Sequence, residues 1–290
     1  SIDICDGKSV YIARWGNLGD DYNKLLRLVF SAEVKKAAHN VKDLMAQLIA
    51  EGLSLDGFIY DTALAAYLLE ATESEYPLER VSMRYFGTEL SGTEAIFKLK
   101  SVTEAKLNEL GMDRLYYEIE LPLCEVLADM ESAGFMVDRR ALSEFGESLN
   151  EGIEKLKTDI WELAGGEFNI NSPKQLGEVL FEKLMLPAGK KTKTGWSTNA
   201  DVLDKLRGKH PIIEMILDYR MLTKLKSTYA DGLLKLIDKD GRIRTKFQMT
   251  VTATGRLSST EPNLQNIPIR KELGSQIRKM FIASSGKTLV

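Results

Sequence analysis

Two hydrophobic periodicities follow one another along this chain. Over residues 1–69, short runs that alternate between apolar and polar residues are each followed by apolar residues spaced three or four positions apart. This pattern predicts strands alternating with helices, and therefore an α/β layer. Strands are expected as a strand–turn–strand at 2–14, at 37–40 and from 57, and helices at 22–30, 41–52 and 63–69.

The middle of the chain is predicted to be helical. Residues 70–113 are polar and are expected to form one or two helices with loops. Longer helices are expected at 115–132, 138–163, 172–184, 197–206 and 211–237. Pro122 breaks the phase of the first of these helices. Asp138 and Ser172 are expected as N-caps of the second and third, and Ser197 with Thr198 as the start of the fourth.

Alternation returns near the end of the chain. Residues 238–241, Asp-Lys-Asp-Gly, have the composition of a hairpin turn. Residues 242–251 then alternate as a strand, and residues 281–282 with 288–290 predict another strand.

The composition is that of a globular protein, since 44% of the 290 residues are apolar. The length allows two domains. No apolar run is long enough to span a bilayer and no secretory leader is visible, so no membrane partner is expected. Cys5 and Cys124 lack metal-ligand spacing and are expected to be thiols in a reducing cytoplasm.

The net charge of −3 hides an asymmetry. Residues 190–290 carry 20 Lys and Arg against 9 Asp and Glu, a net charge of +11, whereas residues 1–189 carry −14. A basic third attached to an acidic remainder is typical of a protein that binds a polyanion with one part only. The alternative is a solvated charged surface.

Residues 252–270, T-A-T-G-R-L-S-S-T-E-P-N-L-Q-N-I-P-I-R, are dense in side chains that donate hydrogen bonds. Arg256 and Arg270 offer guanidinium groups, and Gly255 leaves room for a close approach by another molecule. Amides and arginines of this kind contact bases and phosphates in nucleic-acid interfaces. The same residue types also favour turns, so a plain polar loop is the alternative.

This segment closely resembles the one that enters the palm in family A DNA polymerases, the group of the bacterial DNA polymerase I enzymes. The resemblance extends upstream to 168–176, F-N-I-N-S-P-K-Q-L, to 190–195, K-K-T-K-T-G, and to 219–229. It implies an α+β multidomain fold. The expected parts are an α/β RNase H-like (3'-5' exonuclease-like) domain at 1–112, a helical thumb at 113–237 and the first strands of the palm at 238–290.

Residues 52–69 carry the resemblance to the exonuclease-like domain. In active members, carboxylates of the motifs D-x-E, N-x-K-x-D and Y-x-x-x-D hold two metal ions. Here Asp3 and Asp6 are spaced D-x-x-D, Leu44 occupies the carboxylate position after Asn40 and Lys42, and no Y-x-x-x-D spacing occurs. The resemblance therefore implies a degenerate, inactive exonuclease domain, in which we expect Asp61 to be a helix N-cap.

The palm of the family continues into D-Y-S-x-I-E-x-R, whose Asp is a metal ligand. The chain is expected to stop before this motif, so we expect no catalytic residue and no metal bound to this chain. The resemblance implies that the full-length polymerase binds Mg²⁺. It also implies that the rest of the palm and the fingers bind the deoxynucleoside triphosphates.

Fifteen residues are expected to bind DNA. The basic loop at 190–193, the start of the helix at 172 and one face of the helix at 220–226 suit phosphates, although the basic loop is alternatively a solvated one. By resemblance, Arg256 reaches the minor groove at the primer terminus, and Arg270 contacts the incoming nucleotide or buttresses the loop. The full set is Ser172, Lys174, Lys190, Lys191, Lys193, Arg220, Lys224, Lys226, Thr254, Arg256, Ser258, Asn263, Gln265, Asn266 and Arg270.

The resemblance thus predicts a fragment of a template-directed DNA polymerase of replication and repair, bound to primer–template duplex DNA. We expect a monomer in the bacterial cytoplasm, associated with the nucleoid. The alternative is a self-standing, non-catalytic DNA-binding protein that uses the thumb as a clamp. An active repair exonuclease would need a metal constellation that the motifs do not provide.

Overall fold

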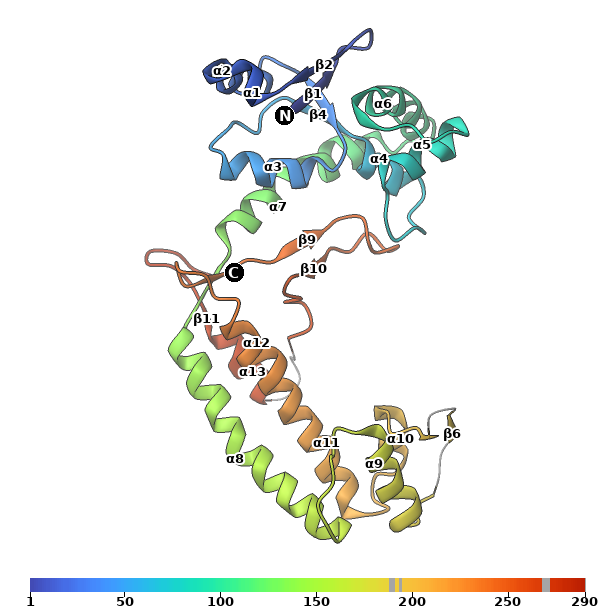
Figure 1. Cartoon of the computed structure of the whole chain (residues 1–290), viewed down its shortest axis with the longest axis vertical. Coiled ribbons are helices and arrows are strands. Elements are labelled where there is room, and N and C mark those ends of the chain that lie inside the picture. The colour runs from blue at the N-terminus through green and yellow to red at the C-terminus, as the bar shows by residue number, and fades with distance from the viewer. Residues whose placement is uncertain (188–190, 193–194, 268–271, 290) are drawn as a thin grey trace. The chain divides into compact units, whose positions relative to one another are not determined.

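A computed structural model describes residues 1–187, 191–192, 195–267 and 272–289 (Figure 1). The chain forms two compact units: unit 1 contains Ser1–Gly134 and Arg244–Asn266, and unit 2 contains Phe135–Ile243 and Ile267–Val290. These bounds differ from the three segments expected from the sequence. None of the described helices is both long and apolar enough to cross a bilayer.

Unit 1 combines short strands with helices. Its elements are β1 (Ile2–Cys5), β2 (Val10–Ala13), α1 (Trp15–Leu18), α2 (Asp20–Val29), β3 (Lys36–Ala38), α3 (Val41–Ala50), β4 (Phe58–Asp61), α4 (Thr62–Leu69), α5 (Leu78–Phe86), α6 (Gly92–Glu109), the π-helical η1 (Leu115–Glu120), α7 (Leu121–Ala133), β9 (Lys246–Gln248) and β10 (Ser258–Thr260).

The expected α/β alternation at the start of unit 1 is present. β1 and β2 form an antiparallel hairpin, and β3 and β4 pair in parallel with α3 between them in the chain. In the part of the chain that is described, these strands remain two separate pairs. The strands are only three or four residues long.

The core of unit 1 explains why its bounds extend beyond residue 112. Leu64 of α4, Leu99 of α6 and Leu127 of α7 are buried in one cluster, to which Met249 of the segment after β9 also belongs. The helix expected to begin the thumb, η1 with α7, therefore packs into unit 1. Tyr116 of η1 and Leu121, Cys124 and Ala128 of α7 are buried in the same cluster.

Unit 2 is built mainly of helices. Its elements are β5 (Phe135–Val137), α8 (Arg139–Ala164), α9 (Pro173–Glu178), η2 (Val179–Lys183), β6 (Lys191–Thr192), β7 (Gly195–Trp196), α10 (Ala200–Lys205), α11 (Pro211–Lys224), η3 (Leu225–Ala230), α12 (Asp231–Leu234), β8 (Arg242–Ile243), α13 (Glu272–Lys279) and β11 (Phe281–Ile282). η2 and η3 are π-helical.

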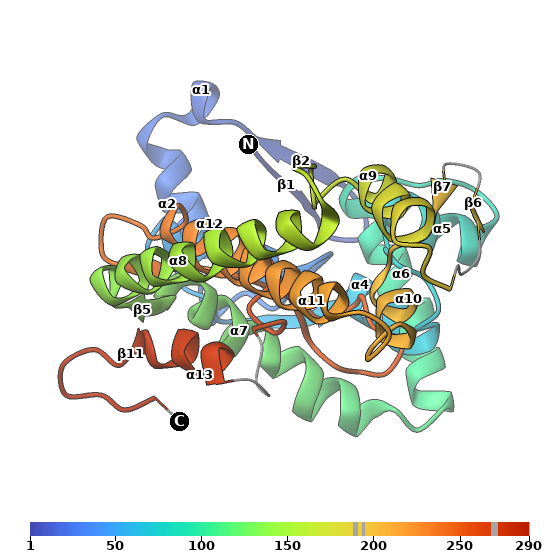
Figure 2. The same ribbon diagram turned by 90° about the horizontal axis from the view of Figure 1, so that it is seen from below.

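The two long helices of unit 2, α8 and α11, lie side by side in both views (Figures 1 and 2). Asp138 caps α8 as expected, because its Oδ1 accepts a hydrogen bond from Ala141 N at 2.9 Å. Leu149 of α8 and Ile216 of α11 are both buried, as expected for the apolar faces of such helices. β11, β5 and β8 form a three-stranded antiparallel sheet in this unit.

Three expectations about element bounds are wrong. The strand expected at 242–251 is divided into β8, which pairs with β5 in unit 2, and β9, which pairs with β10 in unit 1. The helix expected to start at 197–198 begins at Ala200, because Asn199 Oδ1 accepts from Val202 N at 3.0 Å and caps α10. Thr288 and Leu289 form no strand, and Val290 lies outside the described residues.

Candidate nucleic-acid interface

Residues 252–266 of the segment expected to bind DNA lie in unit 1 and contain β10, one strand of a hairpin. β10 pairs antiparallel with β9, so that Ser258 lies opposite Gln248 and Ser259 opposite Phe247. The connection between the strands turns at Gly255, whose φ of +73° favours glycine. Thr252 Oγ1 donates a hydrogen bond to Arg256 O and closes this turn.

Arg256 lies at the exposed end of this connection. Its side chain and that of Thr254 are solvent-exposed. Among the described residues, none accepts a hydrogen bond from the guanidinium of Arg256. The turn therefore holds the backbone of Arg256 while its five N–H donors face outward.

The side-chain amides of Asn263 and Gln265, which follow β10, form hydrogen bonds within the loop. Asn263 Oδ1 accepts from Gln265 N at 3.0 Å and from Asn266 N at 3.3 Å, which makes an Asx-type turn. Gln265 Nε2 donates to Leu257 O at 2.7 Å. All three side chains remain exposed, so the loop is preorganised by groups that also face solvent.

Two buried hydroxyl groups, of Ser259 and Thr245, form hydrogen bonds to the backbone of the same loop. Ser259 Oγ accepts from Leu264 N at 3.0 Å, and Thr245 Oγ1 contacts the carbonyl oxygens of Thr260 and Pro262 at 3.0 and 2.7 Å. Ser259 and Thr245 are buried, whereas Ser258, one of the expected DNA-binding residues, is half-buried in β10. Arg270 lies outside the described residues.

In unit 2, the expected phosphate-binding residues have different environments. Ser172 is the N-cap of α9, as expected, because its Oγ accepts from Gln175 N at 3.4 Å. Lys174 is exposed on this six-residue helix. Lys191 lies in β6, which pairs with β7, while Lys190 and Lys193 lie outside the described residues.

Arg220 and Lys224, which are expected to share a DNA-binding face, both lie on α11 but have different environments. The Arg220 guanidinium donates to Thr198 O and, at 3.3 Å, to Thr198 Oγ1, and burial lowers its pKa. Arg220 thus connects α11 to the segment before α10. Lys224 is exposed, whereas Lys226 forms an ion pair with Asp231 at 2.6 Å. Thr198 could not be recognised as this partner from local sequence, since it lies 22 residues away.

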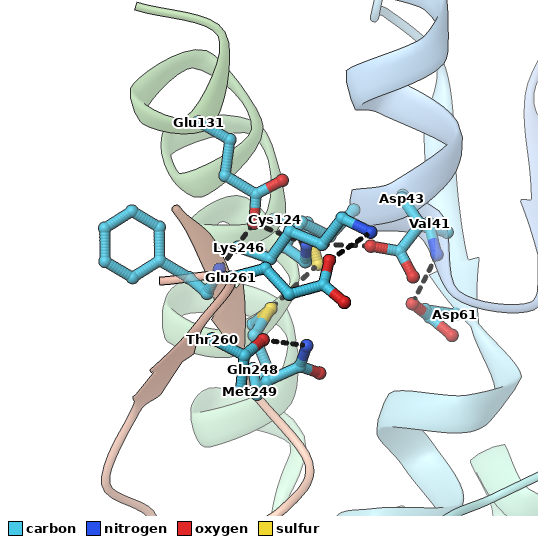
Figure 3. A network of polar contacts seen from close by, with 12 residues as sticks. Val41, Asp43, Asp61, Cys124, Glu131, Lys246, Gln248, Met249, Thr260 and Glu261 are labelled. Carbon is cyan, nitrogen blue, oxygen red and sulfur yellow. Dashed lines mark hydrogen bonds and ion pairs between the residues drawn. The ribbon is translucent and has the colours of Figure 1, made fainter. Parts of the chain in front are cut away.

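Most of the part-buried polar contacts that hold the hairpin could not be predicted from the sequence. Glu131 of α7, which is labelled in Figure 3, accepts hydrogen bonds from Lys42 Nζ at 2.6 Å and from Phe247 N at 2.7 Å. Tyr67 of α4 donates to Thr252 O at 2.7 Å. Only Lys42 had a sequence signal, because it stands at the lysine of the N-x-K-x-D spacing.

Asp61 is a structural carboxylate of unit 1. Asp61, which is 3% exposed, accepts from Ala63 N at 2.9 Å and Leu64 N at 3.2 Å, so it is the N-cap of α4 that was expected. It also accepts from Asn40 N and Val41 N at the start of α3. Among the described residues, no group of three His, Cys, Asp or Glu side chains is arranged to hold a metal ion.

Unit 1 presents an exposed arginine on the β9–β10 hairpin, and unit 2 is a mainly helical unit with exposed lysines. The family model of DNA polymerase family A matches residues 139–290. The chain belongs to this family.

The chain is similar to proteins named DNA polymerase I from several bacteria. It is 43% identical to DNA polymerase I of Caldicellulosiruptor bescii over 279 residues, which cover 92% of this chain and 33% of the relative. It is also 43% identical to DNA polymerase I of Geobacillus stearothermophilus over 283 residues, or 88% of this chain and 32% of the relative. The chain therefore spans about a third of the length of these curated relatives.

A solved structure has a similar fold. It is the POL domain of Pol1 from M. smegmatis in complex with DNA primer-template and dNTP. The similarity has a TM-score of 0.83 at 38% identity, and it covers 93% of this chain and 49% of that one.

Proposed function

We propose that this chain is the part of a template-directed DNA polymerase, acting in replication and repair, that holds the primer–template duplex. The observation that carries the proposal is the exposed guanidinium of Arg256 at the end of a braced hairpin in a member of family A. The net charge of +11 over residues 190–290 supports a polyanionic partner.

Arg256 suits a protein that must bind every correct base pair. The minor groove presents acceptors in similar places for all pairs, namely the purine N3 and the pyrimidine O2. A single forked donor can therefore test the shape of a pair without reading its identity. Thr254, Ser258, Asn263, Gln265 and Asn266 extend the same surface, and Arg270 is proposed to contact the incoming nucleotide or to buttress the loop.

The lysines of unit 2 are proposed to bind phosphates. Lys174 and Lys224 are exposed, and ammonium groups at such positions release counterions without reading sequence. Lys190, Lys191 and Lys193 belong to the same proposed surface, and so does the helix start at Ser172. Arg220 and Lys226 are proposed to contribute charge near the duplex while they remain bound to Thr198 and Asp231.

We propose that residues 1–112 are a degenerate 3'-5' exonuclease-like domain, 113–237 the thumb region and 238–290 the start of the palm. Nucleotidyl transfer needs Mg²⁺, deoxynucleoside triphosphates and the parts of the relatives that this chain does not cover. The chain by itself is accordingly proposed to bind DNA as a monomer without polymerase or exonuclease activity. A DNA substrate is consistent with a bacterial cytoplasmic, nucleoid-associated protein.

Fluorescence anisotropy with a labelled primer–template duplex tests this proposal. We expect salt-dependent binding, and we expect Arg256→Ala to cost about 1–3 kcal/mol of binding free energy. Arg114→Ala is the matched control, because Arg114 is exposed in the same unit and its one ion pair among the described residues is with Glu118 at 3.0 Å. Equal losses for the two variants, or incorporation of a nucleotide by the chain alone with Mg²⁺, would contradict the proposal.

A further inference from the structure

The hairpin β9–β10 depends on other elements for its position. β9 pairs with β10 along one edge, so the N–H groups on its other edge need acceptors elsewhere. Phe247 N on this outer edge donates to Glu131 Oε1 at 2.7 Å. A side chain of α7 thus completes the hydrogen bonding of a strand 116 residues away in the sequence.

Glu131 is held in turn by Lys42 of α3. Lys42 Nζ donates to the same Oε1 at 2.6 Å, and it lies 2.7 Å from Asp43 Oδ1. The Lys42 and Glu131 side chains are only 9% and 11% exposed. Burial by itself lowers the pKa of Lys42, but hydrogen bonds to Asp43 and Glu131 outweigh burial and raise it.

Further contacts continue from β9 towards Arg256. Met249 packs against Cys124 of α7, with 3.8 Å between the two sulfur atoms (Figure 3). Thr252 lies three residues after Met249. Its carbonyl oxygen accepts a hydrogen bond from the Tyr67 hydroxyl, and its own Oγ1 donates to Arg256 O. Helices of unit 1 therefore contact the chain at Phe247, Met249 and Thr252, and Thr252 is hydrogen-bonded to Arg256.

We propose that Glu131, held by Lys42, is a positioning residue for Arg256: it fixes the β9–β10 hairpin on helices α3 and α7. This proposal rests on the proposed function, because it gives Arg256 its role in binding the duplex. Lys42 stands at the lysine of an N-x-K-x-D spacing that has Leu44 in place of the carboxylate. In this chain its task is to support the DNA-binding hairpin.

Neutral variants separate the acceptor role of Glu131 from its charge. Glu131→Gln keeps an oxygen that can accept from Phe247 N, whereas Glu131→Met keeps the length of the side chain and loses the acceptor. Glu94→Gln is the control, because Glu94 is exposed and its removal makes the same change in net charge. Loss of one negative charge alone strengthens DNA binding slightly.

We expect Glu131→Met to raise the Kd for a primer–template duplex roughly tenfold, a typical effect of losing a hydrogen bond to a charged group. Glu131→Gln and Glu94→Gln are expected to stay within about twofold of the unmodified chain on the same reasoning. The Phe247 amide is expected to exchange hydrogen faster in Glu131→Met, and at the original rate in Glu131→Gln. An unchanged exchange rate in Glu131→Met overturns the proposal.

A background of Lys42→Met keeps the comparison possible if Glu131→Met leaves a buried ammonium that prevents folding. Replacing both partners by apolar groups of similar length leaves no unpaired buried charge. In this background, Gln at position 131 is expected to bind DNA more tightly than Met at the same position. Equal affinities for the two double variants overturn the proposal.

Combination with Arg256→Ala distinguishes positioning from a general structural role. If Glu131 acts through Arg256, the change Glu131→Met has less than about a twofold further effect once Arg256 is removed. A full, additive loss in the Arg256→Ala background overturns the positioning role. If Arg256→Ala itself leaves the affinity unchanged, the proposed function fails first, and the exchange rate at Phe247 still tests the attachment of the hairpin to Glu131.

Discussion

Asp61 provides the sharpest stability prediction, because one buried carboxylate serves the starts of two helices. Its Oδ1 accepts from Ala63 N and Leu64 N at the start of α4, and from Asn40 N at 3.1 Å. Its Oδ2 accepts from Val41 N at 2.7 Å, in the first turn of α3. Replacing Asp61 by Ala removes all four acceptor contacts from a position that is 3% exposed.

The expected cost follows from these contacts. Loss of one N-cap costs about 1–2 kcal/mol, and here two helix starts lose their acceptor. Buried N–H groups that water cannot reach add about 1 kcal/mol. Asp61→Ala is therefore expected to lower the free energy of unfolding of unit 1 by about 3–5 kcal/mol. Asp61→Asn keeps one oxygen and is expected to cost about half as much on the same count of acceptors.

Urea unfolding followed by far-ultraviolet circular dichroism measures this cost. Asp21→Ala is the control, because Asp21 is exposed in α2 and is expected to change stability by less than about 0.5 kcal/mol. A loss below about 1 kcal/mol for Asp61→Ala would refute the double-cap reasoning. A melting temperature that Mn²⁺ raises in the unmodified chain but not in the Asp61→Asn variant would instead indicate a metal ligand.

Two further predictions concern stability at acidic pH and the separate roles of Arg220 and Lys224 on α11. Burial lowers the pKa of His39, although nearby Asp61 opposes this shift, so the folded chain favours the neutral ring. The free energy of unfolding of unit 1 should therefore fall by up to about 1.4 kcal/mol per pH unit as the pH drops below about 6.5. Urea titrations at pH 7.5 and 5.5 check this, and a His39→Gln variant with the same pH dependence would contradict it. Arg220→Ala should destabilise unit 2 by about 1–3 kcal/mol through the lost bonds to Thr198, whereas Lys224→Ala should leave stability unchanged and lower the salt slope of DNA binding by about one. Unfolding and anisotropy measurements on both variants decide the matter, since the reverse pattern would show that Arg220 is the phosphate ligand.

Local interactions were predictable from the sequence because they act over a few residues. Asp138 and Ser172 are the N-caps that the sequence indicated, and Pro211 begins a helix as expected. The apolar spacing also predicted α2 and α3 to within a few residues. The family was recognisable for a related reason: the ordered run at 252–270 is a local sequence feature.

The sequence by itself thus determined most of the helices, the caps at Asp61, Asp138 and Ser172, and the identity of the proposed DNA-binding loop. Only the tertiary structure decided that residues 242–251 divide between two sheets, that Arg220 binds Thr198, and that Glu131 receives Phe247 N and Lys42 Nζ. The physical reason is that a buried acceptor is chosen by which donors packing brings within about 3 Å. Such partners lie 22 to 116 residues apart here, a separation at which neither periodicity nor turn chemistry carries a signal.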